Sequence, residues 1–122
     1  MTDTHTIVID KVRNSKIDSI DFDNLTFGKT FTDHMLECTW SQGSWGDVKI
    51  KPYGPIMVEP SCKVFHYGQA IFEGMKAFKD AADDVYLFRP TDNWERFNSS
   101  AKRLAMPEVP EEVFMEGLKK LV

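Results

Sequence analysis

Few side chains in this sequence have the chemistry of a reactive or ligand-binding site. The amines of Lys29 and Lys76 could attack a carbonyl carbon if they were activated, and the guanidinium of Arg96 could bind a phosphate through two parallel hydrogen bonds. From spacing alone, Arg96 is better explained as a solvated arginine beside Ser100 and Arg103 on the polar face of a helix. We interpret both lysines as structural or solvated.

The common catalytic and metal-binding motifs do not occur. Gly28-Lys29-Thr30 resembles the end of a phosphate-binding loop, but Asp23 occupies the position where that motif requires its first glycine. The histidines do not have zinc-ligand spacing, and we expect no metal site. From residue type alone, core packing is the preferred interpretation of Phe72, and less strongly of Phe27 and Tyr67.

Composition limits the class of protein. The chain has 122 residues, enough for one domain, with 42% hydrophobic residues, a net charge of −4 and a pI near 5.3. This charge and the scattered cations argue against a nucleic-acid partner. No apolar stretch approaches the about 20 residues that span a bilayer, so we expect no membrane partner. Without a secretion signal, and with Cys38 and Cys62 expected to be reduced thiols, the predicted location is the cytoplasm.

The elements of the first half are extended. Residues 1–26 are predicted to form an N-terminal arm with one short strand at residues 6–10. Residues 34–40 and 48–51 alternate in polarity and predict an antiparallel hairpin, with a turn at residues 41–44. A short extended piece is expected at residues 56–59, between prolines.

The second half is predicted to be mixed. Residues 67–73 are predicted to form a short helix that Gly74 ends, followed by strands at 75–79 and 85–89. A helix over residues 92–105 is expected to begin with Asp92 as its cap and Glu95 completing a capping box. A last helix over residues 110–122 has acids in its first turn and an apolar stripe that is unfinished at Val122. This pattern favours a chain cut from a longer protein.

Four segments together resemble a known enzyme family. They are FGKTFTDHM at residues 27–35, HYGQAIFEGMKAF at 66–78, LFRP at 87–90 and NWER at 93–96. This combination is similar to the N-terminal domain of branched-chain amino acid aminotransferases, which are fold-type-IV pyridoxal-phosphate enzymes. The resemblance runs from about Phe27 to Val122, and the first segment points to the branched-chain subgroup.

The resemblance implies an α+β fold, in which one antiparallel sheet built from the two hairpins packs against the helices. Residues 27–122 would be the small domain of a two-domain enzyme, incomplete at its C-terminal end and lacking the cofactor domain. Arg96 matches the arginine that holds the cofactor phosphate. Phe27, Tyr67 and Phe72 match aromatic residues of the substrate pocket, and the Tyr67 hydroxyl could meet the substrate carboxylate.

The implied reaction moves an amino group from leucine, isoleucine or valine to 2-oxoglutarate through pyridoxal 5'-phosphate. No residue here matches the catalytic lysine, so the 122-residue chain is expected to be inactive and to bind the cofactor weakly or not at all. The complete enzyme is expected to be a homodimer. Two alternatives stay open: another fold-type-IV enzyme, such as a D-amino acid aminotransferase or aminodeoxychorismate lyase, and a stand-alone binding module without enzymatic activity.

Overall fold

The computed structural model describes residues 5–122 of the chain. The backbone divides into two compact units. One unit reaches as far as Pro55 and also includes Leu121, and the other runs from Ile56 to Lys120 and also includes Val122. Each unit has its own strands, so the two are described separately.

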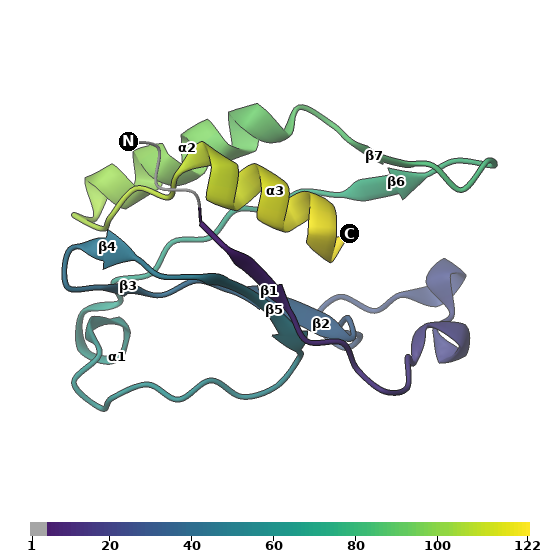
Figure 1. Cartoon of the computed structure of the whole chain (residues 1–122), viewed down its shortest axis with the longest axis horizontal. Helices are drawn as coiled ribbons and strands as arrows, with labels where there is room; N and C mark the ends of the chain where they lie inside the picture. The colour runs from purple at the N-terminus through teal and green to yellow at the C-terminus, as the bar shows by residue number, and fades with distance from the viewer. Residues whose placement is uncertain (1–4) are drawn as a thin grey trace. The chain divides into compact units, whose positions relative to one another are not determined.

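A small mixed sheet forms the centre of the first unit. In the described part of the chain it has the order β1 (Ile7–Ile9), β5 (Val48–Pro52) and β2 (His34–Glu37), as Figure 1 shows. β2 pairs with β5 in antiparallel register, with Leu36 opposite Ile50. β1 pairs with the other edge of β5 in parallel, with Ile7 opposite Val48. The predicted strand at residues 6–10 is therefore confirmed.

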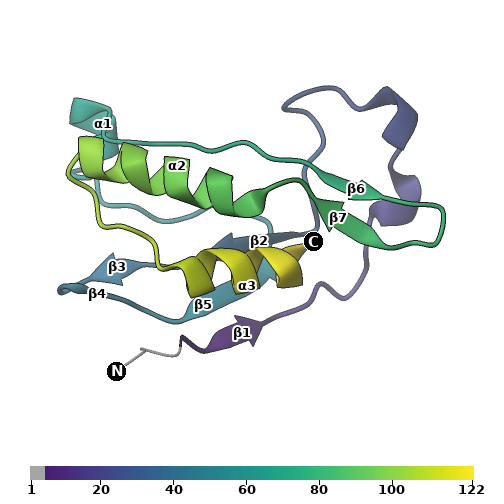
Figure 2. The same ribbon diagram turned by 90° about the horizontal axis from the view of Figure 1, so that it is seen from above.

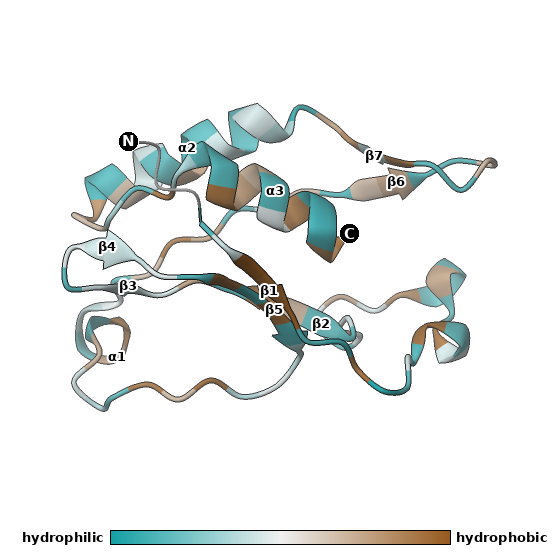
Figure 3. Cartoon of the chain, in the orientation of Figure 1, coloured by the Kyte–Doolittle hydropathy of each residue, from teal (hydrophilic) through white to brown (hydrophobic). Residues whose placement is uncertain are grey.

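The central strand β5 contains the buried positions of this sheet. Val48 and Ile50 are buried, whereas Lys49 between them is exposed. Successive residues of a strand point to opposite faces, so the sequence Val-Lys-Ile has one apolar and one polar face. Figure 3 shows the hydrophobic colour concentrated on β1 and β5 within this sheet.

The predicted hairpin is present but its first strand is interrupted. β2 ends at Glu37, and the chain continues after Cys38 and Thr39 into β3 (Trp40–Ser41), which pairs with β4 (Ser44–Trp45). The turn between them places Gln42 and Gly43 at positive φ, 52° and 85°, which a two-residue hairpin turn requires.

The arm contains two short 3-10 helices, η1 (Ile17–Ser19) and η2 (Phe22–Asn24). The arm is tied to β2 by polar contacts within the unit. The backbone N–H of Val12 donates to His34 Nε2 at 3.0 Å, and Ser15 Oγ donates to Asp33 Oδ2 at 2.5 Å.

The second unit contains a hairpin and three helices among its described residues. The helices are α1 (Lys63–Tyr67), α2 (Pro90–Arg103) and α3 (Glu111–Leu121), and β6 (Ala77–Lys79) pairs with β7 (Val85–Leu87), as Figure 2 shows. The predicted hairpin and the two long helices are confirmed, with slightly different ends. The extended piece expected at residues 56–59 contains no strand.

The start of α2 differs from the prediction. Arg89 is the residue before the helix, with φ 48°, and it forms no side-chain cap. Asp92 lies in the first turn, where its carboxylate forms an ion pair with Arg89 rather than capping the helix. Pro90 begins the helix earlier than expected, because its fixed φ suits the first helical position, where a missing N–H costs nothing.

The expectation of one antiparallel sheet built from both hairpins is wrong. The overall class is α+β, but the strands belong to separate small sheets, and β1 joins β5 in parallel. The β6–β7 hairpin forms a separate two-stranded sheet. Its acidic loop is closed by Asp80 Oδ1, which accepts from the N–H groups of Ala82 and Asp84. Its outer edges do not extend into another sheet in the described residues.

The connection between α2 and α3 is held by a buried amide. Asn98 is 6% exposed, and its side chain both accepts from Val109 N–H and donates to Val109 C=O, each at 2.8 Å. The indole N–H of Trp94 donates to the same carbonyl at 2.7 Å. Phe97 and Phe114 then pack across the two helices with ring centroids 6.1 Å apart. No helix in the described residues is long and apolar enough to cross a membrane.

Candidate functional site

The segment at residues 69–76 positions the candidate site. Sequence reasoning predicted a helix at residues 67–73, and this prediction is wrong. The helix α1 lies earlier and ends at Gly68, and residues 69–76 are extended, with no helix or strand assigned. Figures 1 and 2 both show this segment beside α2, leading from α1 to β6.

Glycine explains why the helix stops early. Gly68 has φ 60° in the left-handed region, which glycine adopts without the steric penalty of a Cβ. After it, burial alternates with a period of two: the odd-numbered positions are partly buried and the even-numbered ones exposed. The members of the partly buried set are Gln69, Ile71, Glu73 and Met75. This period is typical of an extended chain with one face against a neighbour.

Side chains tie both ends of the 69–76 segment to α2. At one end, Gln69 Nε2 donates to the carbonyl oxygen of Leu104 at 2.8 Å. At the other end, Asn93 Nδ2 donates to the carbonyl oxygen of Gly74 at 3.2 Å. The segment therefore runs antiparallel to α2.

Glu73 and Arg96 form the central contact between the segment and α2. Arg96 Nε donates to Glu73 Oε2 at 2.8 Å, and Arg96 Nη2 donates to Glu73 Oε1 in a second, parallel bond. Glu73 Oε1 also accepts from Asn93 Nδ2 and from the Gly74 N–H, each at 3.0 Å. The Glu73 side chain is 7% exposed, whereas that of Arg96 is 69% exposed.

These contacts hold Glu73 ionised. The hydrogen bond from Arg96 is the main reason that the pKa of the Glu73 carboxyl falls from its ordinary 4.5 to about 2. Bonds from Asn93 and Gly74 also lower the pKa. Together with the bond from Arg96 they outweigh desolvation, which raises the pKa. The same bond raises the pKa of Arg96, so the pair stays charged throughout the neutral range.

The guanidinium of Arg96 keeps one edge open. Glu73 uses the Nε–Nη2 edge, which leaves both N–H groups of Nη1 and the second N–H of Nη2 for another acceptor. No other side chain in residues 5–122 bonds to these groups. Since a guanidinium is planar, the open edge is directed away from Glu73, and its geometry suits two oxygens of a phosphate.

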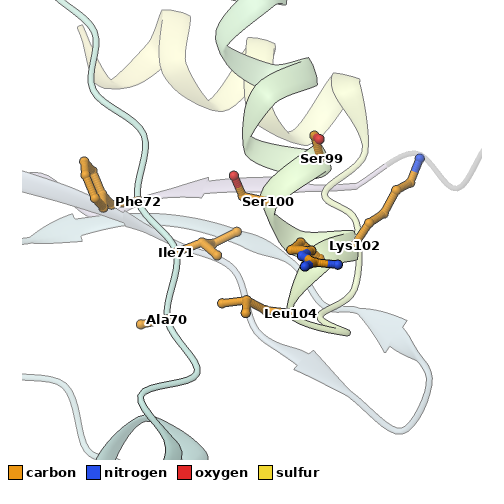
Figure 4. A pocket seen from close by; sticks show the side chains of 8 residues that line it. Ala70, Ile71, Phe72, Ser99, Ser100, Lys102 and Leu104 are labelled. Atoms are coloured by element: carbon orange, nitrogen blue, oxygen red, sulfur yellow. The ribbon is translucent and has the colours of Figure 1, made fainter.

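An open groove of about 820 Å³ lies between the 69–76 segment and the C-terminal half of α2. Figure 4 shows Ile71 extending toward Leu104, while the ring of Phe72 extends away from the helix. Ser100, one turn beyond Arg96 on α2, lines the groove and donates its hydroxyl to the Arg96 carbonyl at 3.1 Å. The lining residues are Ala70, Ile71, Phe72, Ser99, Ser100, Lys102, Arg103 and Leu104.

The three predicted aromatic residues are all exposed. Phe72 is 91% and Tyr67 is 83% exposed, and both belong to the second unit, but they border different hollows. Phe27 belongs to the first unit and is fully exposed. Core packing, which residue type alone favours for Phe72 and less strongly for Phe27 and Tyr67, is therefore wrong for all three. Exposure does not test the predicted role of these three rings in the substrate pocket, which stays a prediction.

The two lysines are also exposed, and neither forms a contact in the described residues that would activate its amine. Lys76 follows the 69–76 alternation on its exposed side, and Lys29 lies in the turn after Phe27. Their interpretation as solvated side chains agrees with the structure.

Sequence reasoning missed one residue of this site, Asn93, to which it assigns no role. For Glu73 it predicts a contact with backbone donors or with a basic side chain, and the structure confirms both, with the Gly74 N–H and with Arg96. The sequence carries no polarity alternation that would reveal the extended conformation, because Ala70, Ile71 and Phe72 are apolar in succession between the polar Gln69 and Glu73. The alternation appears only in the burial of the folded chain.

Comparison with known proteins supplies close relatives. No family model matches the chain. A probable branched-chain-amino-acid aminotransferase of Staphylococcus epidermidis is 48% identical over 118 residues, covering 93% of this chain. The branched-chain-amino-acid aminotransferase of Mycolicibacterium smegmatis is 49% identical over 81% of this chain, and that of Dictyostelium discoideum is 41% identical over 94%. The chain spans about a third of the length of these relatives: 33%, 27% and 31% respectively.

Proposed function

Because this chain belongs, as a segment, to the branched-chain-amino-acid aminotransferase family, we propose that it supplies one wall of the active site in a whole enzyme of that activity. That enzyme transfers the amino group between leucine, isoleucine or valine and 2-oxoglutarate. The observation that carries this proposal is the 48% identity over 93% of the chain.

The donor set of this chain fits a phosphorylated cofactor. When bound, pyridoxal 5'-phosphate supplies an aldehyde that accepts the amino group and a ring that withdraws electrons. Arg96 offers a charged, planar edge with two neighbouring N–H directions, which is the chemistry that phosphate oxygens require. In this proposal Arg96 binds the phosphate, and its helix gives the guanidinium a fixed direction.

The exposed aromatic residues would form the substrate side of the site. Phe72 and Tyr67 present apolar ring surface on the second unit, and Phe27 does so on the first. Rigid rings can hold a branched aliphatic side chain and exclude water at a small cost in side-chain entropy. The Tyr67 hydroxyl would donate to the substrate carboxylate. The whole enzyme is proposed to be a homodimer in which some of these rings serve the neighbouring subunit.

The remaining parts of the proposal concern the whole protein. Residues 1–26 would be an arm and residues 27–122 the small domain of a two-domain fold-type-IV enzyme, whose other domain provides the catalytic lysine. The 122-residue chain alone would be inactive. A cytoplasmic location is part of this proposal, and the two free thiols of Cys38 and Cys62 are compatible with it.

The relatives compared above are named as branched-chain enzymes, which supports this subgroup over a D-amino acid aminotransferase or a lyase. A stand-alone binding module has no observation in its favour.

The decisive experiment uses the full-length protein that contains this segment. Purified enzyme is supplied with pyridoxal phosphate and 2-oxoglutarate, and glutamate formation is measured with each of several L- and D-amino acids. We expect turnover with leucine, isoleucine and valine and little with alanine, aspartate or D-amino acids. Preference for a D-amino acid, or turnover that Arg96→Gln leaves unchanged at limiting cofactor, would contradict the proposal.

A further inference from the structure

We propose that Glu73 is a positioning residue, which fixes the guanidinium of Arg96 so that its open edge faces a phosphate-bearing ligand. This inference rests on the proposed function, because it takes Arg96 as the phosphate ligand. It assigns a role to a negatively charged carboxylate beside a site for an anion, which its charge would repel.

The contacts of the pair support positioning. An arginine side chain has several rotatable bonds, and a free one loses considerable entropy when a ligand immobilises it. Here the bonds to Glu73 occupy Nε and one N–H of Nη2, which determines the plane and direction of the guanidinium before any ligand binds. The remaining N–H groups then form a rigid fork.

Glu73 is itself held in place. Its oxygens accept from Asn93 and from the Gly74 N–H, and its side chain is 7% exposed while Arg96 is 69% exposed. The anchored carboxylate lies against α2, and the guanidinium bonded to it extends into solvent. This is the asymmetry expected if the carboxylate serves as the support and the guanidinium as the binding group.

Charge alone predicts the opposite effect, and this makes the inference testable. A carboxylate next to the binding site repels an anion, so removing its charge should tighten phosphate binding if Glu73 does nothing else. If Glu73 positions Arg96, its removal should weaken binding in spite of the lost repulsion. The sign of the change therefore decides between the two roles.

The variants are made in the full-length enzyme. Glu73→Gln keeps the shape of the side chain, but its amide can accept only one of the two bonds from Arg96. Glu95→Gln removes the same charge from the exposed residue next to Arg96 on α2 and is the matched control. Arg96→Gln is the reference for complete loss of the ligand. Thermal melts followed by circular dichroism check that each variant folds.

The readouts are the affinity of the cofactor-free enzyme for pyridoxal phosphate, from a fluorescence titration, and the ³¹P resonance of the bound cofactor. We expect Glu73→Gln to weaken binding about tenfold, the loss expected for one charged hydrogen bond. We expect Glu95→Gln to change the affinity by less than about twofold, because an exposed charge is screened. The ³¹P resonance of Glu73→Gln should move toward that of Arg96→Gln, and adding Glu73→Gln to Arg96→Gln should weaken binding no further.

Each outcome has one meaning. If Arg96→Gln weakens binding while Glu73→Gln binds as tightly as Glu95→Gln or tighter, the positioning role is wrong and the proposed function stands. If Arg96→Gln leaves the affinity and the ³¹P resonance unchanged, both are wrong. Should Glu73→Gln fail to fold, Asn93→Ser replaces it, because this change removes a bond that holds Glu73 and leaves the charge in place. It should weaken binding about threefold, because the support that Glu73 gives to Arg96 is weakened and not lost. If this variant binds the cofactor as tightly as the wild type, the inference is wrong.

Discussion

At the scale of single residues, the site depends on one buried acceptor. Glu73 accepts from Arg96 and Asn93, which are distant in the sequence, and from its neighbour Gly74, and these bonds lower the pKa of its carboxyl, with Arg96 the largest cause. Arg96 in turn receives its direction from a residue that precedes it by more than twenty positions. A sequence motif predicts Arg96 as a phosphate ligand, but the carboxylate that contacts it lies in a segment for which the helix prediction is wrong.

The pKa of Glu73 predicts acid sensitivity. The folded protein keeps this carboxyl ionised down to about pH 2, whereas the unfolded chain protonates it near 4.5. The stability it contributes is therefore fully present above about pH 4.5 and decreases as the pH falls toward 2, because the unfolded state then binds more protons. Denaturant unfolding of wild type and Glu73→Gln between pH 7 and pH 2.5 should show a difference in unfolding free energy that shrinks with acid. A difference independent of pH would contradict this.

The buried amide of Asn98 predicts a second residue-scale effect. Asn98→Ala leaves the N–H of Val109 without its acceptor at a partly buried position, so we expect the unfolding free energy to fall by about 2 kcal/mol. Ser99→Ala, one residue further on the exposed side of α2, should change it by less than about 0.5 kcal/mol. Equal losses for the two variants in urea titrations would show that the Asn98 bridge contributes little.

At the scale of elements, the end of α1 determines where the 69–76 segment begins. Gly68 turns the chain out of the helix, and the side chains of Gln69 and Glu73 then bind α2 in place of helical backbone bonds. In a helix, Gln69 and Glu73 would share one face but lie only about 6 Å apart along the axis, whereas an extended chain advances about 13 Å over the same four residues. Their partners Leu104 and Arg96 are separated by about 12 Å of helical rise, so the extended conformation lets both contacts form together.

Alanine at two glycines tests this element. Gly68→Ala meets no neighbouring atom but requires a left-handed residue with a Cβ, so we expect a loss of about 1 kcal/mol in unfolding free energy. Gly74→Ala also has open space and is not at positive φ, so its effect should stay within about 0.5 kcal/mol. The comparison is made by thermal and denaturant unfolding, and a larger loss at Gly74 would be inconsistent with Gly68 as the helix stop.

At the scale of the whole molecule, the chain spans about a third of its relatives and exposes three aromatic rings that the proposal places in a pocket. Rings such as Phe27, which is fully exposed, favour a surface that another part of the enzyme covers. We therefore expect parts of the proposed whole enzyme outside this segment to contribute to its active site.

Cofactor binding by the isolated segment tests this division. Neither Lys29 nor Lys76 is buried, so the 122-residue chain should not capture pyridoxal phosphate through an amine at one per chain. We expect no visible absorbance band of stoichiometric intensity after gel filtration, whereas the full-length enzyme should retain one. A retained band in the isolated chain, abolished by Lys76→Ala, would place the reactive amine in this segment and refute the division.

The amino-acid sequence was enough to predict the α+β class, the β2–β5 pairing, the β6–β7 hairpin and the two long helices, because each depends on a short repeating pattern of apolar residues or on a nearby turn. It also indicated the family through four segments at fixed spacing, and it predicts Arg96 as a phosphate ligand, a role that stays a prediction. Only the tertiary structure decided that β1 pairs in parallel, that residues 69–76 are extended, and that Glu73 holds Arg96. These features depend on partners distant in the sequence, and a local pattern has no information about which distant group will complete a hydrogen bond.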